Sequence, residues 1–272
     1  MTTTLENVSS VGGQASRGNR PSGIPFTRVM SVEFRKMFDT RSGFWLLMSI
    51  GILALLASAA VIIFGGDSGI TYQNFGTAVG IPMSILLPVI AILSVTSEWS
   101  QRTGLTTFTL VPHRGRVIVA KLACAIVVGV GSMLLAMGIG ALGNLVGGLI
   151  RGVDPAWNID FRQLAYIVLS NVLTMLIGFM LGVLIRNSAG AIVGYFVYGF
   201  VLPTITGILA GTQAWFRDDV QKWVDFQFHQ NKLFSDTALT GSDWGYLAFT
   251  GTLWLVLPLA FGLWRLLRAE VK

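Results

Sequence analysis

Six long runs of apolar residues dominate this chain and limit the folds that it can adopt. A helix that crosses the hydrocarbon core of a membrane needs about 20 predominantly apolar residues. The sequence supplies such runs at 44–64, 79–95, 122–149, 164–185, 189–210 and 246–264. Only 12% of the 272 residues are charged, about half the share that is typical of soluble domains. We therefore predict an all-α membrane protein with six transmembrane helices.

Two of the runs depart from a simple spanning helix. The run 79–95 is short and contains Pro82 and Pro88. Because proline removes a backbone donor and kinks a helix, we expect this span to be bent. The run 122–149 would be about 42 Å long at 1.5 Å per residue, which exceeds a bilayer core of about 30 Å. This helix must tilt or project into water.

Glycine pairs spaced four residues apart recur in or beside the third, fourth and fifth runs. Small residues at this spacing let two helix backbones approach each other closely in a membrane, so the pairs favour a tightly packed bundle. They are Gly143 and Gly147, Gly178 and Gly182, Gly190 and Gly194, and Gly207 and Gly211.

The distribution of lysine and arginine predicts the orientation of the chain. Six spans bring both termini to one side, and the opposite side holds only 5 of the 19 basic residues: Arg151, Arg162, Arg217, Lys222 and Lys232. Cytoplasmic loops carry the excess of Lys and Arg, so we predict cytoplasmic termini in a bacterial plasma membrane. Residues 1–24 are rich in Thr, Ser and Gly and lack the apolar core of a signal peptide. We expect them to form a disordered cytoplasmic tail before a transmembrane domain at 25–272.

Ionisable residues are absent from the interior of all six runs. Ion-coupled transporters usually carry such residues at membrane depth, and none is available here as a relay or a catalytic base. The two histidines, His113 and His229, fall on opposite sides and cannot share a metal ion. We therefore predict no catalytic, metal or cofactor-binding residues. The net charge of +6 comes from basic residues at the ends of apolar runs, which indicates membrane lipids rather than nucleic acid as partners.

Residues 25–41 precede the first run and form the pattern of an amphipathic elbow helix at the membrane surface. Its apolar face comprises Phe26, Val29, Met30, Phe34, Met37 and Phe38, and its polar face carries Lys36. Glu33 falls on the apolar face, where an unpaired charge is costly. Two alternatives follow for this carboxylate. It pairs with a cation of the next cytoplasmic connection, Arg102 or Arg114, or it reaches the lipid headgroups.

The connection between the second and third runs reads EWSQRTGLTTFTLVPHRGRVIVAKL and is the most polar internal stretch of the chain. We predict a short helix over 97–110 and a turn at 112–115. The order of its residues resembles the cytoplasmic loop of permease subunits of the ABC-2 membrane-transporter family. The residues that carry the resemblance are Glu98, Arg102, Thr103, Gly104, Pro112, Arg114, Arg116 and Lys121. Many members read Gly-Thr where this chain has Thr103-Gly104. The elbow with Glu33 and Lys36, the six spans and a long outer loop extend the resemblance along the chain.

The resemblance implies a half-transporter, not an enzyme, that works with a separate ABC ATPase subunit and with a second permease copy or paralogue. The loop would be a coupling helix that docks on the ATPase. ATP and Mg would be bound by that partner, since the chain has no GxxxxGK[ST] segment. The expected substrate is a hydrophobic or amphipathic compound, such as a drug, antibiotic or lipid-like molecule. The alternatives are a non-transporting subunit of a resistance or sensing complex, or a membrane-embedded scaffold or enzyme.

The outer loop 211–245 contains apolar residues at helical spacing, among them Phe216, Val220 and Trp223. One interpretation is an interfacial helix that caps the bundle. The other is an outer gate, since members of the resembled family often fold short re-entrant helices here.

Overall fold

The computed structural model describes residues 25–39, 41–100, 114–235 and 237–268. Over these ranges the protein is nearly all-helical, and its single β-bridge joins Thr71 to Ala156. The predicted all-α fold is confirmed. The helices are α1 (Phe26–Asp39), α2 (Arg41–Phe64), α3 (Tyr72–Ser100), α5 (Arg114–Arg151), α6 (Phe161–Ile185), α7 (Ser188–Phe196), α8 (Leu202–Thr212), α9 (Gln221–Val224), α10 (Phe226–Lys232), α11 (Gly241–Gly251) and α12 (Leu257–Arg268).

Six helical segments in the described part of the chain are long and apolar enough to cross a membrane, as predicted. They are Gly43–Phe64, Tyr72–Ser97, Gly115–Arg151, Phe161–Ile185, Ser188–Thr212 and Gly241–Arg268. The expected tail 1–24 lies outside the described residues.

Helices α3 and α5 are both longer than the apolar runs expected from the sequence. Helix α3 has 29 residues and continues through Pro82 and Pro88. It starts at Tyr72, seven residues before the expected position, because its first turn is held to the connection between α5 and α6. The Tyr72 amide donates to the Ala156 carbonyl over 2.9 Å, and the Gln73 amide donates to Asn158 Oδ1 over 3.1 Å. Helix α5 has 38 residues, about 57 Å at 1.5 Å per residue.

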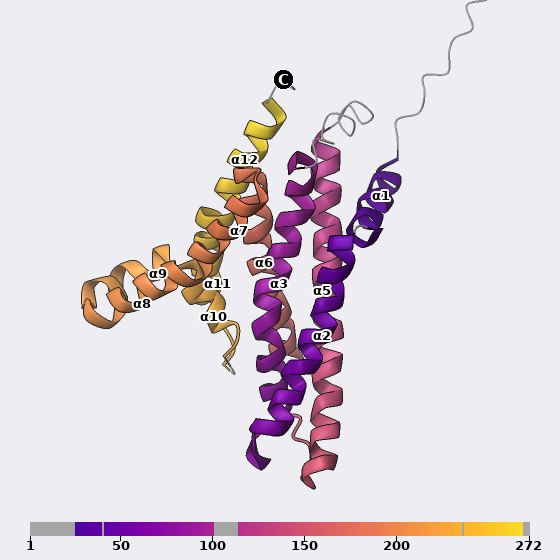
Figure 1. Cartoon of the computed structure of the whole chain (residues 1–272). Coiled ribbons are helices and arrows are strands. Elements are labelled where there is room, and N and C mark those ends of the chain that lie inside the picture. Colours follow the sequence, from indigo (N-terminus) through magenta and orange to yellow (C-terminus); the bar gives the residue numbers. More distant parts are fainter. Residues whose placement is uncertain (1–24, 40, 101–113, 236, 269–272) are drawn as a thin grey trace, which may run out of the picture.

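Helix α3 lies at the centre of a bundle with α2, α5 and α6 (Figure 1). The core contains Met83 and Leu87 of α3, Met133 of α5, and Met175 and Phe179 of α6, each at most 2% exposed. These side chains follow helical spacing on facing surfaces, so each helix buries an apolar stripe against its neighbours.

One predicted glycine pair brings two backbones together. A Cβ atom at Gly178 would lie 2.6 Å from the Pro88 carbonyl oxygen, and one at Gly182 would lie 3.3 Å from the Ile92 oxygen. Helix α6 therefore needs glycine where it crosses α3. Gly143 and Gly147 instead face side chains that include Phe75, and Gly190 and Gly194 face Ile185. Nothing lies within 4 Å of a Cβ at Gly207 or Gly211.

The last two spans each contain a π-helical turn within one helical stretch. A π-helical turn at Val197–Val201 separates α7 from α8, and another at Thr252–Val256 separates α11 from α12. Each turn ends two residues before a proline, Pro203 or Pro258. A proline leaves the carbonyl four residues earlier without its helical donor, which favours the wider turn. Beyond its turn, α8 has no buried residue and extends with α9 away from the bundle (Figure 1).

Candidate functional site

A buried ion cluster joins α1 to α5. The Lys121 ammonium on α5 lies 2.5 Å from Glu33 Oε2 on α1, and Lys36 Nζ lies 2.7 Å from Glu33 Oε1. The side chains of Glu33 and Lys121 are only 5% and 4% exposed. Lys121 also donates to the Ser94 carbonyl of α3 over 3.2 Å. One ammonium group therefore connects three helices.

The amphipathic pattern of α1 explains how Glu33 becomes buried. Val29, one turn earlier, is 7% exposed and packs with Val117 and Ala120 of α5. Phe34 and Phe38 are 39% and 41% exposed. The apolar face expected from the sequence is therefore divided between α5 on one side and the surroundings of the protein on the other, and Glu33 lies on the part that packs.

The cluster identifies two partners of Glu33, Lys121 and Lys36, that the sequence analysis did not name for it. Burial of its carboxylate against Lys121 and Lys36 contradicts the headgroup alternative. The two loop arginines predicted as partners are not tested, because Arg102 and the Arg114 side chain lie outside the described residues. A signal in the sequence was available. Lys121 is surrounded by apolar residues in its helix and needs a carboxylate as much as Glu33 needs a cation.

The cluster lies near the connection that the sequence analysis proposed as a docking element. Lys121 comes about two turns after the start of α5, and Ser94 about two turns before the end of α3. Arg102, Thr103, Gly104 and Pro112 lie outside the described residues. The backbone of Glu98 is in the last turn of α3, and Arg114 begins α5. The predicted turn at 112–115 is wrong at its end, because Gly115 is already helical.

Arg116 is the one proposed docking residue whose side chain the structure describes. It is exposed on the first turns of α5 rather than in a loop. Its neighbours Val117 and Ile118 are buried, so this end of α5 presents a cation outward while its other face packs. That position keeps Arg116 available to a partner outside the bundle.

The segment that the sequence analysis proposed as a gate, within 211–245, forms a second buried cluster. Phe216 is 6% exposed, whereas Trp223 is 46% exposed and packs edge-on against Tyr246 and Phe249 of α11. Val220 is half-buried. The three predicted gate residues thus occupy the turn and short helix that precede α10, and Trp223 attaches this segment to the last span.

Polar residues that the sequence analysis did not single out lie beneath this segment. Asp225 is buried, accepts a hydrogen bond from the Phe228 amide over 2.9 Å, and starts α10. Gln221 donates to the other Asp225 oxygen over 3.3 Å. The spacing of four residues between Gln221, Asp225 and His229 places them on one side of a helix. This spacing could have indicated from the sequence that a polar side of the segment faces inward.

His229 is 1% exposed, and its ring stacks on Tyr246 at 5.5 Å between centroids. Its Nε2–H donates to the Lys222 carbonyl over 2.9 Å, so Nδ1 is the unprotonated nitrogen of the neutral ring. Nδ1 has no hydrogen-bond partner in the described structure. Burial lowers the pKa of His229 below its ordinary value, and the Lys222 carbonyl offsets part of this effect. The ring is therefore neutral at pH 7.

The π-helical turns of the last two spans meet at this cluster. Tyr198 of the first turn and Trp254 of the second have ring centroids 6.0 Å apart. Trp254 Nε1 donates to the Val224 carbonyl over 2.6 Å, which ties the outer segment to the sixth span. Because π-helical turns often mark functional positions in helices, this junction is the second candidate site.

Comparison with known proteins supports the family resemblance that the sequence showed. A family model described as ABC-2 family transporter protein matches residues 29–212, which run from α1 to the end of α8 and include the ion cluster and the connection between α3 and α5. No curated protein matches the chain. The matched region covers more than half of the 272 residues. This multi-pass membrane protein therefore belongs to the ABC-2 family of transporter proteins.

Proposed function

We propose that the chain is the permease subunit of an ATP-driven ABC exporter that forms the membrane pathway for a hydrophobic or amphipathic compound. The family match over 29–212 carries this proposal. The ion cluster supports it, because Lys121 contacts α1 and α3 just inside the segment where a coupling element would dock.

The energy for transport would come from a separate ABC ATPase subunit that binds ATP and Mg. The connection from Glu98 to Arg116 would dock on that subunit. The exposed side chain of Arg116 is suited to a charge-assisted contact, and charged groups at an interface fix its register. The chain itself contains no GxxxxGK[ST] phosphate loop.

The same arrangement favours a cytoplasmic position for this end of the molecule. The start of α5, the end of α3 and the end of α12 lie at one end of the bundle (Figure 1), and that end carries most of the Lys and Arg residues. In a bacterial plasma membrane, α1 would then be an interfacial elbow helix. Its exposed Phe34 and Phe38 would contact lipid while Glu33 faces the protein.

The nature of the buried polar groups supports a hydrophobic or amphipathic substrate. Those in the middle of the described spans, such as Ser132, Ser170 and Asn171, are neutral. Lys121 is the buried charge within a span and is held by Glu33 near the end of α5. A pathway without free charges does not favour a small ion.

The outer segment and α8 would supply the remaining parts of an exporter. The cluster of Asp225, His229 and Trp254 would act as an outer gate, because it connects the outer segment to a π-helical turn of the last span. A second permease copy, identical or paralogous, would cover α8, whose Ile205 and Ile208 are 48% and 61% exposed.

A second candidate function keeps the same fold. The chain could be the membrane subunit of an ATPase complex that senses or resists a compound without carrying it across. The connections of the ion cluster fit this function equally well, since they transmit movement whether or not a substrate crosses the membrane.

Co-purification with the ATPase tests the shared part of both functions, and transport separates them. The chain and its ATPase would be expressed together, purified, and reconstituted in lipid vesicles. Compound-stimulated ATP hydrolysis with accumulation of the compound in the vesicle lumen is expected for an exporter. Stimulated hydrolysis without accumulation supports the sensing complex, and failure to co-purify contradicts both.

A further inference from the structure

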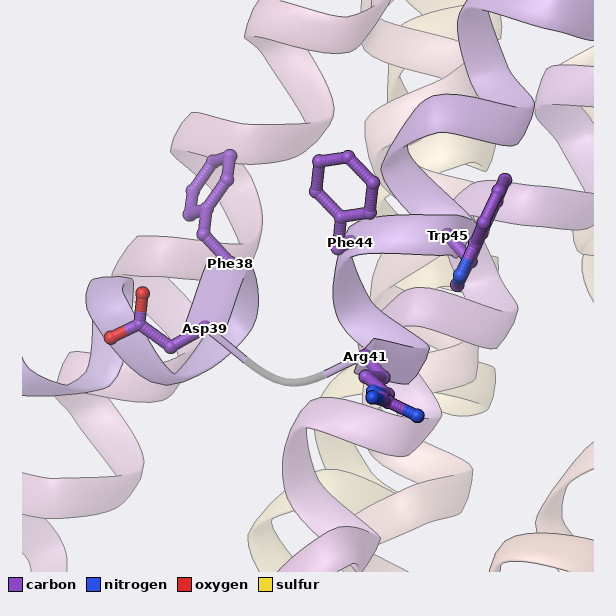
Figure 2. A pocket seen from close by; sticks show the side chains of 5 residues that line it. All are labelled: Phe38, Asp39, Arg41, Phe44 and Trp45. Carbon is purple, nitrogen blue, oxygen red and sulfur yellow. The ribbon is translucent and has the colours of Figure 1, made fainter.

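An open hollow lies between the end of α1 and the start of α2. It has a volume of about 320 Å³ and is lined by Phe38, Asp39, Arg41, Phe44 and Trp45. Figure 2 shows the Phe38 and Phe44 rings directed to the same side, whereas the Asp39 and Arg41 side chains point to opposite sides below them. None of these residues belongs to the ion cluster of Glu33 and Lys121.

We propose that this hollow binds the headgroup of a phospholipid that carries both a phosphate and an ammonium group. The assignment goes beyond transport and does not depend on the ATPase partner. The phosphate would bind the Arg41 guanidinium, the ammonium group would bind the Asp39 carboxylate, and the upper parts of the acyl chains would contact Phe38, Phe44 and Trp45.

The charges of the hollow match the two ends of such a headgroup. Arg41 offers planar N–H donors that suit phosphate oxygens, and Asp39 is an acceptor for an ammonium group. Both side chains are exposed. In the described part of the chain the two residues make no ion pair with each other or with another residue. Each therefore keeps its charge available to a ligand.

The depth of the hollow in a membrane follows from the adjoining span. The apolar segment of α2 begins at Gly43, so Arg41 lies just outside it, at the level of the headgroups. This placement holds for either orientation of the protein. Trp45 and Phe44 are 65% and 49% exposed, and aromatic rings at this level are typical of the membrane interface.

The size of the hollow selects a headgroup rather than a whole lipid. About 320 Å³ is at the lower end of small-molecule sites, and the hollow is open, so the acyl chains would leave it along the exposed aromatic rings. A soluble ligand would gain little from these rings in water. A lipid buries them, which is why the aromatic lining favours a lipid over free phosphate.

Native mass spectrometry of the purified full chain in detergent would test the proposal. Phosphatidylethanolamine would be titrated against phosphatidylglycerol, which has a phosphate but no ammonium group, and against inorganic phosphate. We expect higher occupancy by phosphatidylethanolamine. Arg41→Gln should lower the affinity for both lipids about two- to fivefold, in the range of an exposed ion pair. Asp39→Asn should lower only the affinity for phosphatidylethanolamine and remove the preference.

Two matched variants control for general charge effects. Arg35→Gln removes an exposed cation from α1 outside the hollow, and Asp154→Asn removes an exposed carboxylate from an outer loop. Both should bind the lipids like the unaltered protein. Equal losses in Arg35→Gln and Arg41→Gln, an unchanged preference in Asp39→Asn, or displacement of the lipid by equimolar inorganic phosphate would each overturn the assignment. The measurement needs no ATPase, so its result is separate from that of the transport test.

Discussion

The ammonium of Lys121 and the carboxylate of Glu33 lie 2.5 Å apart although 88 residues separate them in the chain. Both side chains are almost fully buried. The pair therefore fixes the position of α1 against α5, and the Ser94 carbonyl extends the same contact to α3. Movement of either end of the connection between α3 and α5 would reach α1 through this ion pair and through the packing of Val29 on α5.

Removal of one partner should destabilise the protein strongly. Lys121→Met leaves the Glu33 carboxylate buried beside the exposed Lys36 alone, and loss of one member of a buried pair costs about 3–5 kcal/mol. Replacement of both, as Glu33→Leu with Lys121→Met, should recover most of that loss. Thermal unfolding of the four proteins of this cycle in detergent measures the coupling.

Lys36→Met is the control for this cycle. The Lys36 side chain is 43% exposed, and exposed pairs contribute about 1 kcal/mol or less. A loss in Lys36→Met as large as that in Lys121→Met would show that burial of the pair is not what stabilises the contact. Additive effects in the double variant would show that the two side chains do not interact.

Three arginines should matter for the ATPase and not for the fold. Replacement of Arg102, Arg114 and Arg116 by Ala should abolish stimulation of the ATPase, because buried charge-assisted contacts at an interface are worth about 2–5 kcal/mol each. Co-purification and ATP hydrolysis measure the effect at equal membrane abundance. As control, Arg162, Arg217 and Lys222 replaced together remove the same charge from the opposite side. Wild-type stimulation in the first triple variant would rule out the docking role.

Much of the architecture could be predicted from the sequence because membrane spans depend on length and apolarity alone. The ends of the spans were harder to predict from the sequence. Helix α3 begins at Tyr72 because its first turn bonds to Ala156 and Asn158 in another connection. Such contacts form between segments far apart in the chain, and a hydropathy pattern contains no information about them.

The candidate sites, like the spans, could be predicted only in part from the sequence. The position of Glu33 on an apolar face predicted that its charge needs a partner, and the helical wheel was sufficient for that. The identity of the partner depended on where α1 lies along α5, which periodicity does not specify. The burial of His229 also escaped prediction, because α10 is short and polar and is covered by Tyr246 of a different helix.

Labelling of introduced cysteines should establish the orientation. In a Cys124→Ala background, a reagent that cannot cross the membrane should reach thiols at Ser68, Asn158 and Ser235 from outside. It should reach Thr103 and Ala269 only after permeabilisation. The excess of Lys and Arg on one side is the physical reason. Outside labelling at Thr103 would contradict both the orientation and the docking role.

Acidification should loosen the outer cluster through His229. Burial lowers the pKa of His229 in the folded protein, whereas in the unfolded chain this pKa is about 6.5. The unfolded state then binds the proton first as the pH falls, so stability is present above that value and is lost as the pH drops toward the folded pKa. Thermal unfolding between pH 7.5 and pH 5 measures this dependence.

The charged groups around His229 modify this dependence without reversing it. Lys232 lowers its pKa, while Asp225 and Asp243 raise it less than burial lowers it. His229→Gln should therefore flatten the pH dependence. His113→Gln, the matched change at the other histidine, should leave it unchanged. An equally steep loss of stability in His229→Gln would assign the effect to other groups.

The exposed face of α8 should form contacts between two permease copies. No residue of α8 is buried, and Ile208 is 61% exposed beside Gly207 and Gly211, where nothing lies within 4 Å. Small residues with open space let a second helix approach closely. In a Cys124→Ala background, oxidation of Ile208→Cys with copper phenanthroline in membranes should therefore give a dimer on a denaturing gel.

A thiol on a face directed toward lipid provides the comparison. Leu55 of α2 is 60% exposed, nearly as much as Ile208, so Leu55→Cys reports random collisions between proteins in the same membrane. The expected result is a strong dimer band for Ile208→Cys and a weak one for Leu55→Cys. A band for Ile208→Cys that forms only with a co-expressed paralogue would identify a heterodimer. Equal bands for the two variants would mean that lipid, and not a second copy, covers α8.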